Sequence, residues 1–135
     1  MLLIDKLSQK PVYEQIIEGI ERNILCGLYP PESQLPSLRE LSVTLGINPN
    51  TIQKSYAELT RRGIILPSPG SGCYVSPDAL MLLREEARKR LPELTRLLSE
   101  LRLAGIDREE IRTVLTSVFP EGEDKIPSSD KEESV

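Results

Sequence analysis

The sequence contains no histidine and no tryptophan, and only one phenylalanine among its 135 residues. Without histidine, the chain lacks the side chain most often used for proton transfer near neutral pH and the commonest protein ligand of transition metals. Its two cysteines, Cys26 and Cys73, lie far apart and form no C-x-x-C pair, so no metal site is expected. A Gly-rich phosphate loop followed by Lys-Ser/Thr is also missing. We therefore expect no enzyme activity and no cofactor, and a core built from Leu and Ile.

Long apolar runs are missing as well. No stretch approaches the roughly 18 apolar residues that a membrane span requires. The first residues, MLLIDKLSQK, do not resemble a signal peptide, which carries a longer apolar run. We expect no membrane contact and a cytoplasmic protein with reduced cysteines. Cys26 is expected to pack in or beside the core.

The acidic charge of the chain is confined to one end. Residues 1–76 contain seven Lys/Arg and seven Asp/Glu, whereas residues 120–135 contain two lysines and six acids. That excess of four acids equals the net charge of −4 of the whole chain. The acidity therefore says nothing about partners of the first 76 residues. A neutral segment of this kind would nevertheless make few phosphate contacts if it bound nucleic acid.

The most informative segment reads LPSLRELSVTLGINPNTIQKSYAELTRRGIILPSPGSGCYV. Ser37 and Glu40 have the S-x-x-E spacing of a capping box, in which each side chain bonds a backbone N–H at the start of a helix. Gly46 stands where a left-handed residue would end that helix. Asn48 and Pro49 then provide an N-cap and a favourable first residue for a second helix.

The second helix has one apolar stripe, formed by Ile52, Tyr56 and Leu59. If this stripe faces the core, short polar, amide and cationic side chains occupy the exposed N-terminal turn. These side chains suit hydrogen bonds to base edges and contacts with phosphate. A short hairpin follows, with strands expected over 64–66 and 73–75. Two helices, a tight turn and a hairpin are typical of a winged helix-turn-helix.

The sequence resembles the N-terminal DNA-binding domain of the GntR family of bacterial transcription regulators. The similarity spans residues 5–76, and its motifs are PVYEQIIEGI (11–20), LPSLREL (35–41), GINPNTIQKSYAEL (46–59), RGII (62–65) and GSGCYV (70–75). The NPNTIQKSY motif and the short chain are similar to the YtrA-like subfamily. The resemblance implies that the following residues bind DNA: Ser37, Arg39, Asn48, Asn50, Thr51, Gln53, Lys54, Gly70, Ser71 and Gly72.

Two departures from the family pattern stand out. The family usually carries a glycine where this chain has Glu32. The family's wing is commonly basic, whereas the equivalent stretch here reads PSPGSG. Backbone N–H groups and hydroxyls remain for phosphate, so we expect a weaker contribution from the wing.

Residues 77–119 have a different pattern. A helix is expected over about 78–103, interrupted by Pro92, which should kink or split it. Asp107 and Glu110 have the spacing of a second capping box, and an amphipathic helix follows. These helices could pack on the first 76 residues, or their apolar stripes could meet a symmetry mate. The resemblance favours the second alternative, with an interface of Leu83, Ala87, Leu91, Leu94, Leu98, Leu101, Ile111 and Leu115.

We thus expect a mainly α protein with a winged helix-turn-helix over 1–76, a two-helix dimerisation extension over 77–119 and a disordered acidic tail over 120–135. The implied function is a homodimeric, sequence-specific regulator, expected to act as a repressor. It would insert the helix 49–62 into double-stranded DNA at a near-palindromic operator. The rival hypothesis is a winged-helix adaptor that binds proteins and has lost DNA binding. No residue points to an effector.

Overall fold

The computed structural model describes residues 2–122 and divides the chain into two compact units, with the boundary between Lys89 and Arg90. The first unit contains α1 (Val12–Leu25), α2 (Leu38–Leu45), α3 (Pro49–Arg61), the antiparallel strands β1 (Ile65–Ser68) and β2 (Gly72–Val75), and α4 (Ala79–Arg88). The second unit contains α5 (Leu91–Leu103) and α6 (Arg108–Val118). The expected acidic tail, apart from residues 120–122, lies outside the described residues.

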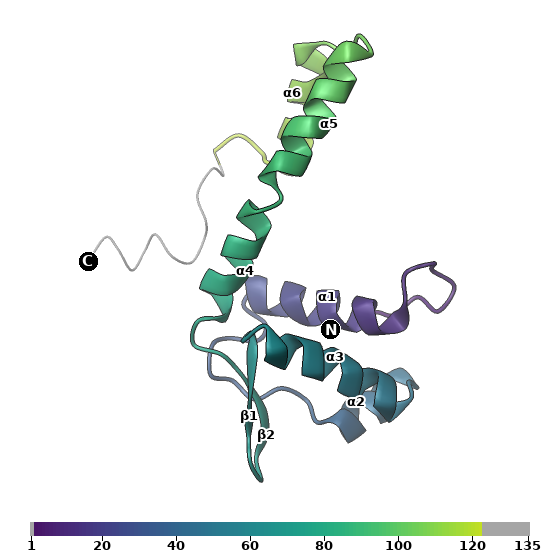
Figure 1. Cartoon of the computed structure of the whole chain (residues 1–135), viewed down its shortest axis with the longest axis vertical. Helices are drawn as coiled ribbons and strands as arrows, with labels where there is room; N and C mark the ends of the chain where they lie inside the picture. The colour runs from purple at the N-terminus through teal and green to yellow at the C-terminus, as the bar shows by residue number, and fades with distance from the viewer. Residues whose placement is uncertain (1, 123–135) are drawn as a thin grey trace, which may run out of the picture. The chain divides into compact units, whose positions relative to one another are not determined.

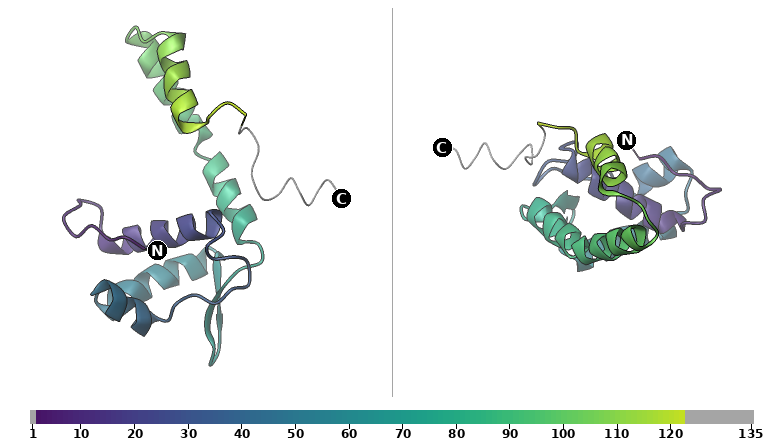
Figure 2. Two further views of the ribbon diagram at one scale, coloured as in Figure 1. Left: turned by 180° about the vertical axis from the view of Figure 1, so that it is seen from behind. Right: turned by 90° about the horizontal axis from the view of Figure 1, so that it is seen from above.

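The core of the first unit is aliphatic, as the scarcity of aromatic residues predicts. α1 and α3 lie side by side (Figures 1 and 2), α2 crosses the N-terminal end of α3, and the hairpin continues from its C-terminal end. The largest fully buried apolar side chains are Ile16, Ile20, Ile24, Ile52, Leu59, Ile64, Ile65 and Val75. This is the winged helix-turn-helix that the sequence predicts.

Capping residues begin and end α2, and begin α3, where the sequence predicts. The Ser37 hydroxyl accepts from the Glu40 N–H at 3.0 Å, the Glu40 carboxylate accepts from the Ser37 N–H, and the capping box is complete. Gly46 ends α2 with a φ of 67°. The Asn48 side chain accepts from the Asn50 N–H at 2.8 Å, and Pro49 begins α3.

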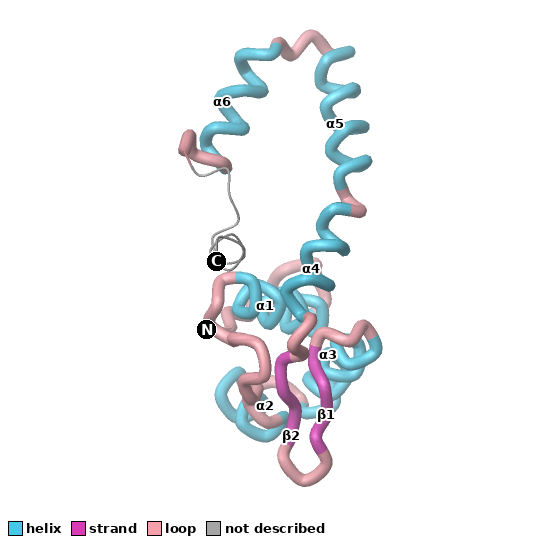
Figure 3. The backbone as a smooth tube through the Cα atoms, turned by 90° about the vertical axis from the view of Figure 1, so that its left-hand side faces the viewer, coloured by secondary structure: helices cyan, strands magenta, loops and turns pink. Residues whose placement is uncertain are grey.

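The hairpin forms the wing and projects from the helices (Figure 3). Its strands are slightly longer toward the tip than expected, with Ile65 paired with Val75 and Ser68 with Gly72. The loop before α2 also pairs with β2. The Leu35 N–H donates to the Cys73 carbonyl and the Val75 N–H donates to the Ser33 carbonyl, each at 2.9 Å. The wing is therefore supported along β2 by a segment that the sequence alone indicates only as loop.

Glu32 begins this supporting segment in a conformation that favours glycine. Its φ is 68°, the only left-handed φ of a non-glycine residue in the part of the chain that the structure describes. A β-carbon is disfavoured in this region because it approaches the following carbonyl oxygen. The position at which the family resemblance implies a glycine thus has a backbone conformation that favours glycine.

The structure places α4 in the first unit, which corrects the expected boundary at residue 76. Ala79 is fully buried and Leu83 is only 5% exposed, because both side chains pack into the core beside α1. Leu83 is therefore a core residue and not part of a dimer surface. An apolar stripe shows that a helix is buried on one side, but it does not show which surface covers it.

The second unit is a helical hairpin without a core of its own. Pro92 lies in the first turn of α5, where its missing N–H costs no hydrogen bond, and the expected long helix is split just before it, at residues 89–90. Asp107 and Glu110 complete the second capping box at α6. No residue of α5 or α6 is buried, and the two helices turn back on each other through a short loop (Figure 3).

Cys26 is exposed, so the expectation that it packs in or beside the core is wrong. The residue caps the C-terminal end of α1, and its thiol donates to the Asn23 carbonyl. Among the described residues, no helix has the length and apolar character needed to cross a membrane.

Candidate nucleic-acid interface

The N-terminal half of α3 presents polar side chains to solvent. Its buried side contains the predicted apolar residues Ile52, Tyr56 and Leu59, which are 0%, 5% and 0% exposed, and also Ser55, which is fully buried. The opposite side consequently faces outward: Asn50, Gln53 and Lys54 are exposed, and Thr51 is half-buried. The burial of one stripe thus decides which side chains are available to a ligand.

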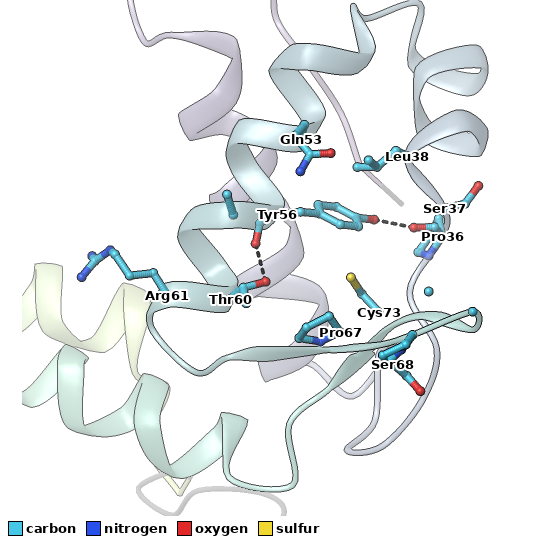
Figure 4. A pocket seen from close by; sticks show the side chains of 14 residues that line it. Pro36, Ser37, Leu38, Gln53, Tyr56, Thr60, Arg61, Pro67, Ser68 and Cys73 are labelled. Carbon is cyan, nitrogen blue, oxygen red and sulfur yellow. Dashed lines mark hydrogen bonds between the residues drawn. The ribbon is translucent and has the colours of Figure 1, made fainter.

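A groove runs between α3, the start of α2 and the wing (Figure 4). Its volume is about 730 Å³, and its walls contain four of the residues predicted to bind DNA. Figure 4 shows Gln53 on the α3 side and Ser37 at the start of α2. The complete lining is Pro36, Ser37, Leu38, Gln53, Tyr56, Ala57, Thr60, Arg61, Pro67, Ser68, Pro69, Gly70, Gly72 and Cys73.

Tyr56 holds the two helices of the groove together. Its hydroxyl donates to the Pro36 carbonyl at 2.6 Å (Figure 4), which links α3 to the residue just before the α2 cap. Burial raises the pKa of the Tyr56 phenol well above its usual value. The phenol therefore remains protonated, and it donates this hydrogen bond throughout the physiological pH range.

The wing tip is shaped by a tight turn and held from one side. The Ser71 N–H donates to the Ser68 carbonyl at 2.8 Å, and Gly70 and Gly72 have φ values of 79° and 88°. Gln34, which the sequence analysis did not single out, donates from Nε2 to the Ser71 carbonyl at 2.6 Å. The Ser71 N–H and carbonyl are thus engaged within the protein, while its exposed hydroxyl makes no hydrogen bond among the described residues.

Two of the residues predicted to bind DNA also cap helices. The side-chain oxygens of Ser37 and Asn48 both cap helices. The Ser37 hydroxyl retains its proton as a donor, and the Asn48 amide retains its N–H groups. Each could therefore cap its helix and still donate to a phosphate.

The cations of the first unit fall into two groups. Arg61 binds Glu58, and Arg62 binds both Glu21 and Glu86. Within the described chain, neither Arg39 nor Lys54 has a carboxylate partner, and both side chains are exposed. The two cations predicted from the sequence to contact DNA are thus exposed and not engaged by a carboxylate.

The paired arginines show how strongly their partners act on them. Hydrogen bonding to Glu86, with a further contribution from Glu21, raises the pKa of Arg62. The pKa of Arg61 is raised and that of Glu58 is lowered, in both cases through their mutual hydrogen bonds. Arg61 lines the groove, but its guanidinium is bound by Glu58. The i, i+3 spacing of Glu58 and Arg61 was the only sequence signal for that pair, and the pairs of Arg62 with Glu21 and Glu86 had none.

Cys73 lies in the groove wall opposite Tyr56 (Figure 4). The residue is half-buried, and burial raises the pKa of its thiol.

The described residues contain no group of three or more His, Cys, Asp or Glu side chains that could hold a metal ion.

Comparison with known proteins agrees with this geometry. The family model described as bacterial regulatory proteins, gntR family, matches residues 12–75. The HTH-type transcriptional repressor YtrA of Bacillus subtilis is 39% identical over 112 residues, which cover 82% of this chain and 86% of that protein. A GntR family transcriptional regulator from Listeria monocytogenes has a similar structure, with a TM-score of 0.70, 35% identity and coverage of 84% of this chain and 98% of that one. The AraR DNA-binding domain in complex with operator ORX1 matches with a TM-score of 0.50 and 30% identity, over 56% of this chain and 93% of that chain.

Proposed function

This chain belongs to the GntR family of bacterial regulatory proteins, and we propose that it is a homodimeric repressor that recognises a near-palindromic operator through α3. Its relatives are transcription regulators, and DNA-binding domains of the family bind operator DNA.

The observation that carries the proposal is the arrangement of the α3 surface. Asn50, Gln53 and Lys54 are exposed on one end of the helix, and a groove beside them ends at the wing. Amide side chains can bond adenine in two places through the major groove. Arg39 and Lys54 have no carboxylate partner among the described residues, so both are available for phosphate. The surface therefore supplies base readout and charge although the unit as a whole has no net charge.

The exposed apolar side chains of the second unit support the proposed dimer. Leu91, Leu94 and Leu97 of α5 are each at least half exposed. Leu115 of α6 and Phe119, which caps that helix, are exposed to a similar degree. Apolar side chains that line two helices and find no cover within their own chain are typical of an interface between subunits. We propose that the α5–α6 hairpins of two copies cover each other. Of the residues expected from the sequence, Leu91, Leu94, Leu98, Leu101, Ile111 and Leu115 remain in this proposal, and Leu97, Val114, Val118 and Phe119 are added. Ala87 is exposed but belongs to α4, outside the hairpin.

A dimer of this kind would read two half-sites. Their centres should lie about one helical turn, roughly 34 Å, or a multiple of it apart. Two copies would also double the number of phosphate contacts, which compensates for the lack of net positive charge in residues 1–76 of each subunit. Because chromosomal DNA is the target, we place the protein in the bacterial cytoplasm, on the nucleoid when bound. We propose no catalytic activity and leave open whether a small effector acts on the dimer.

The proposal is tested by titrating the full-length protein against DNA from upstream of its own gene, with a scrambled fragment as the control, at several salt concentrations. We expect tight binding of two subunits to the upstream fragment that persists near physiological salt. Leu94→Glu should yield a monomer that binds the same fragment much more weakly.

Two other outcomes would point elsewhere. Equally weak, salt-sensitive binding to both fragments would contradict recognition of that operator. Failure to bind either fragment at low salt would replace the regulator with the protein-binding adaptor. The polar α3 surface disfavours the adaptor, because protein interfaces are enriched in aromatic and apolar side chains at their centres.

A further inference from the structure

The Lys54 side chain rests on an aromatic ring from another helix. Its ammonium nitrogen lies 3.8 Å from the centroid of the Tyr13 ring, which belongs to the first turn of α1. A cation in this position is attracted by the negative face of the ring. The contact joins a residue predicted to bind phosphate to a tyrosine in α1 for which the sequence analysis offered no role.

The ring is a fixed support because its backbone is attached to α3. The buried Ser55 hydroxyl donates to the Tyr13 carbonyl at 2.9 Å, and Ser55 is the neighbour of Lys54 in the chain. Ile16, one turn further along α1, is fully buried against the same core. The Tyr13 backbone and the start of the Lys54 side chain are consequently held at a set distance by contacts that do not involve the polar end of either side chain.

The surrounding charges explain why a ring serves better here than a carboxylate. Glu14 and Glu58 line the same hollow as Tyr13 and Lys54. Glu58, however, is bound by Arg61 through two hydrogen bonds of 2.9 and 2.6 Å. A carboxylate paired with Lys54 would neutralise the positive charge that attracts a DNA phosphate. An aromatic ring orients the ammonium without neutralising it, and it leaves the N–H groups on the far side free to donate.

We propose that Tyr13 is a positioning residue that holds Lys54 extended toward a phosphate of the operator backbone. This inference rests on the proposed function and assigns a task in DNA binding to α1. A lysine side chain has high rotamer entropy, part of which is lost whenever a flexible side chain is ordered in a complex. Holding the side chain in place beforehand reduces that loss.

The test measures operator affinity of the full-length protein as a function of salt for the parent, Tyr13→Leu, Tyr13→Phe, Lys54→Ala and the Tyr13→Leu/Lys54→Ala double variant. Tyr13→Phe removes only the hydroxyl, which contacts Glu14 at 3.4 Å, and serves as the matched control. We expect Tyr13→Leu to weaken binding by a dimer about tenfold and Tyr13→Phe to bind like the parent. Lys54→Ala should lower the slope of log K against log salt by about 0.9 per contact.

The double variant separates positioning from a general structural role. If Tyr13 acts through Lys54, Tyr13→Leu has no further effect once Lys54 is alanine. An equal loss in both backgrounds, or a parent-like affinity of Tyr13→Leu, would overturn the inference. These outcomes differ from failure of the proposed function, in which the parent protein itself would not distinguish operator from scrambled DNA.

Discussion

The guanidinium of Arg62 binds the carboxylate of Glu86 through two nitrogens, with Nε 3.0 Å from Oε2. Arg62 caps the C-terminal end of α3, and Glu86 lies in α4. The same guanidinium also binds Glu21 of α1, and its side chain is only 19% exposed. One arginine thus connects three helices and attaches α4 to the recognition helix.

Arg62→Met should therefore destabilise the first unit. Removing the cation leaves two partly buried carboxylates without a partner, and we expect the free energy of unfolding to fall by about 1 to 2 kcal/mol. Urea denaturation followed by circular dichroism measures this difference. Arg61→Met is the matched control, because the Arg61–Glu58 pair is exposed and its loss should change stability little. Equal effects of the two substitutions would contradict a special role for Arg62.

Tyr56→Phe should reveal the bond to Pro36 through its pH dependence. At pH 7 the lost hydrogen bond should cost about 1 kcal/mol. Because the pKa of Tyr56 is raised in the folded state, its contribution is fully present below the unfolded pKa of about 10 and is lost as pH rises beyond it. Denaturation curves from pH 7 to 11 should show the parent and Tyr56→Phe converging above pH 10. A difference that stays constant across this range would show that Tyr56 ionises as easily in the folded as in the unfolded state.

Glu32→Gly should make the protein more stable. Glycine removes the strain of a β-carbon at a φ of 68°, and after its larger backbone entropy is subtracted the gain should be about 0.5 to 1 kcal/mol. Thermal denaturation provides the measurement. Glu32→Ala is the control, because it removes the carboxylate but keeps the β-carbon, and it should bring no such gain. A larger gain from alanine than from glycine would assign the effect to charge.

Arg39→Ala and Gln53→Ala should weaken operator binding without lowering the melting temperature. Both side chains are exposed and make no hydrogen bond or ion pair within the described chain. Loss of one bidentate base contact typically costs about 1 to 3 kcal/mol of discrimination. Binding isotherms for operator and scrambled DNA, measured beside melting curves, check both halves of the prediction. Unchanged operator affinity would remove these residues from the interface.

Cys73 should be protected from alkylation by DNA. Its raised pKa lowers the thiolate fraction at neutral pH, so we expect it to react with a maleimide more slowly than the exposed Cys26. Saturating operator DNA should slow Cys73 further, because the thiol lines the groove beside α3. The Cys26 rate is the internal reference and should not change. Slowing at both cysteines would indicate a global effect of DNA on the protein instead of coverage of this groove.

Much of the candidate interface could be predicted because its elements are specified locally. Ser37, Glu40, Gly46 and Asn48 each act on backbone groups within a few residues, and the structure has the helix ends where these residues place them. The outward direction of Gln53 and Lys54 follows from the buried stripe of the same helix. The left-handed position of Glu32 could be anticipated only through the family's glycine, since glutamate itself carries no turn signal.

Pairings between distant segments had no such signal. Gln34 and the wing, Tyr13 and Lys54, and Arg62 and Glu86 are each brought together by packing of elements far apart in the chain. The split of the long helix ahead of Pro92 was predictable from proline chemistry, but the attachment of its first half to the core was not.

The sequence by itself determined where helices begin and end, which stripe of each is apolar and which side chains α3 leaves exposed. These properties depend on hydrogen bonds and periodicities within a few turns. Only the tertiary structure decided that Leu83 belongs to the core, that Arg61 and Arg62 are occupied by carboxylates, and that Lys54 rests on Tyr13. An apolar stripe or a charge specifies what kind of surface it needs, and the packing of the whole unit selects the surface that it meets.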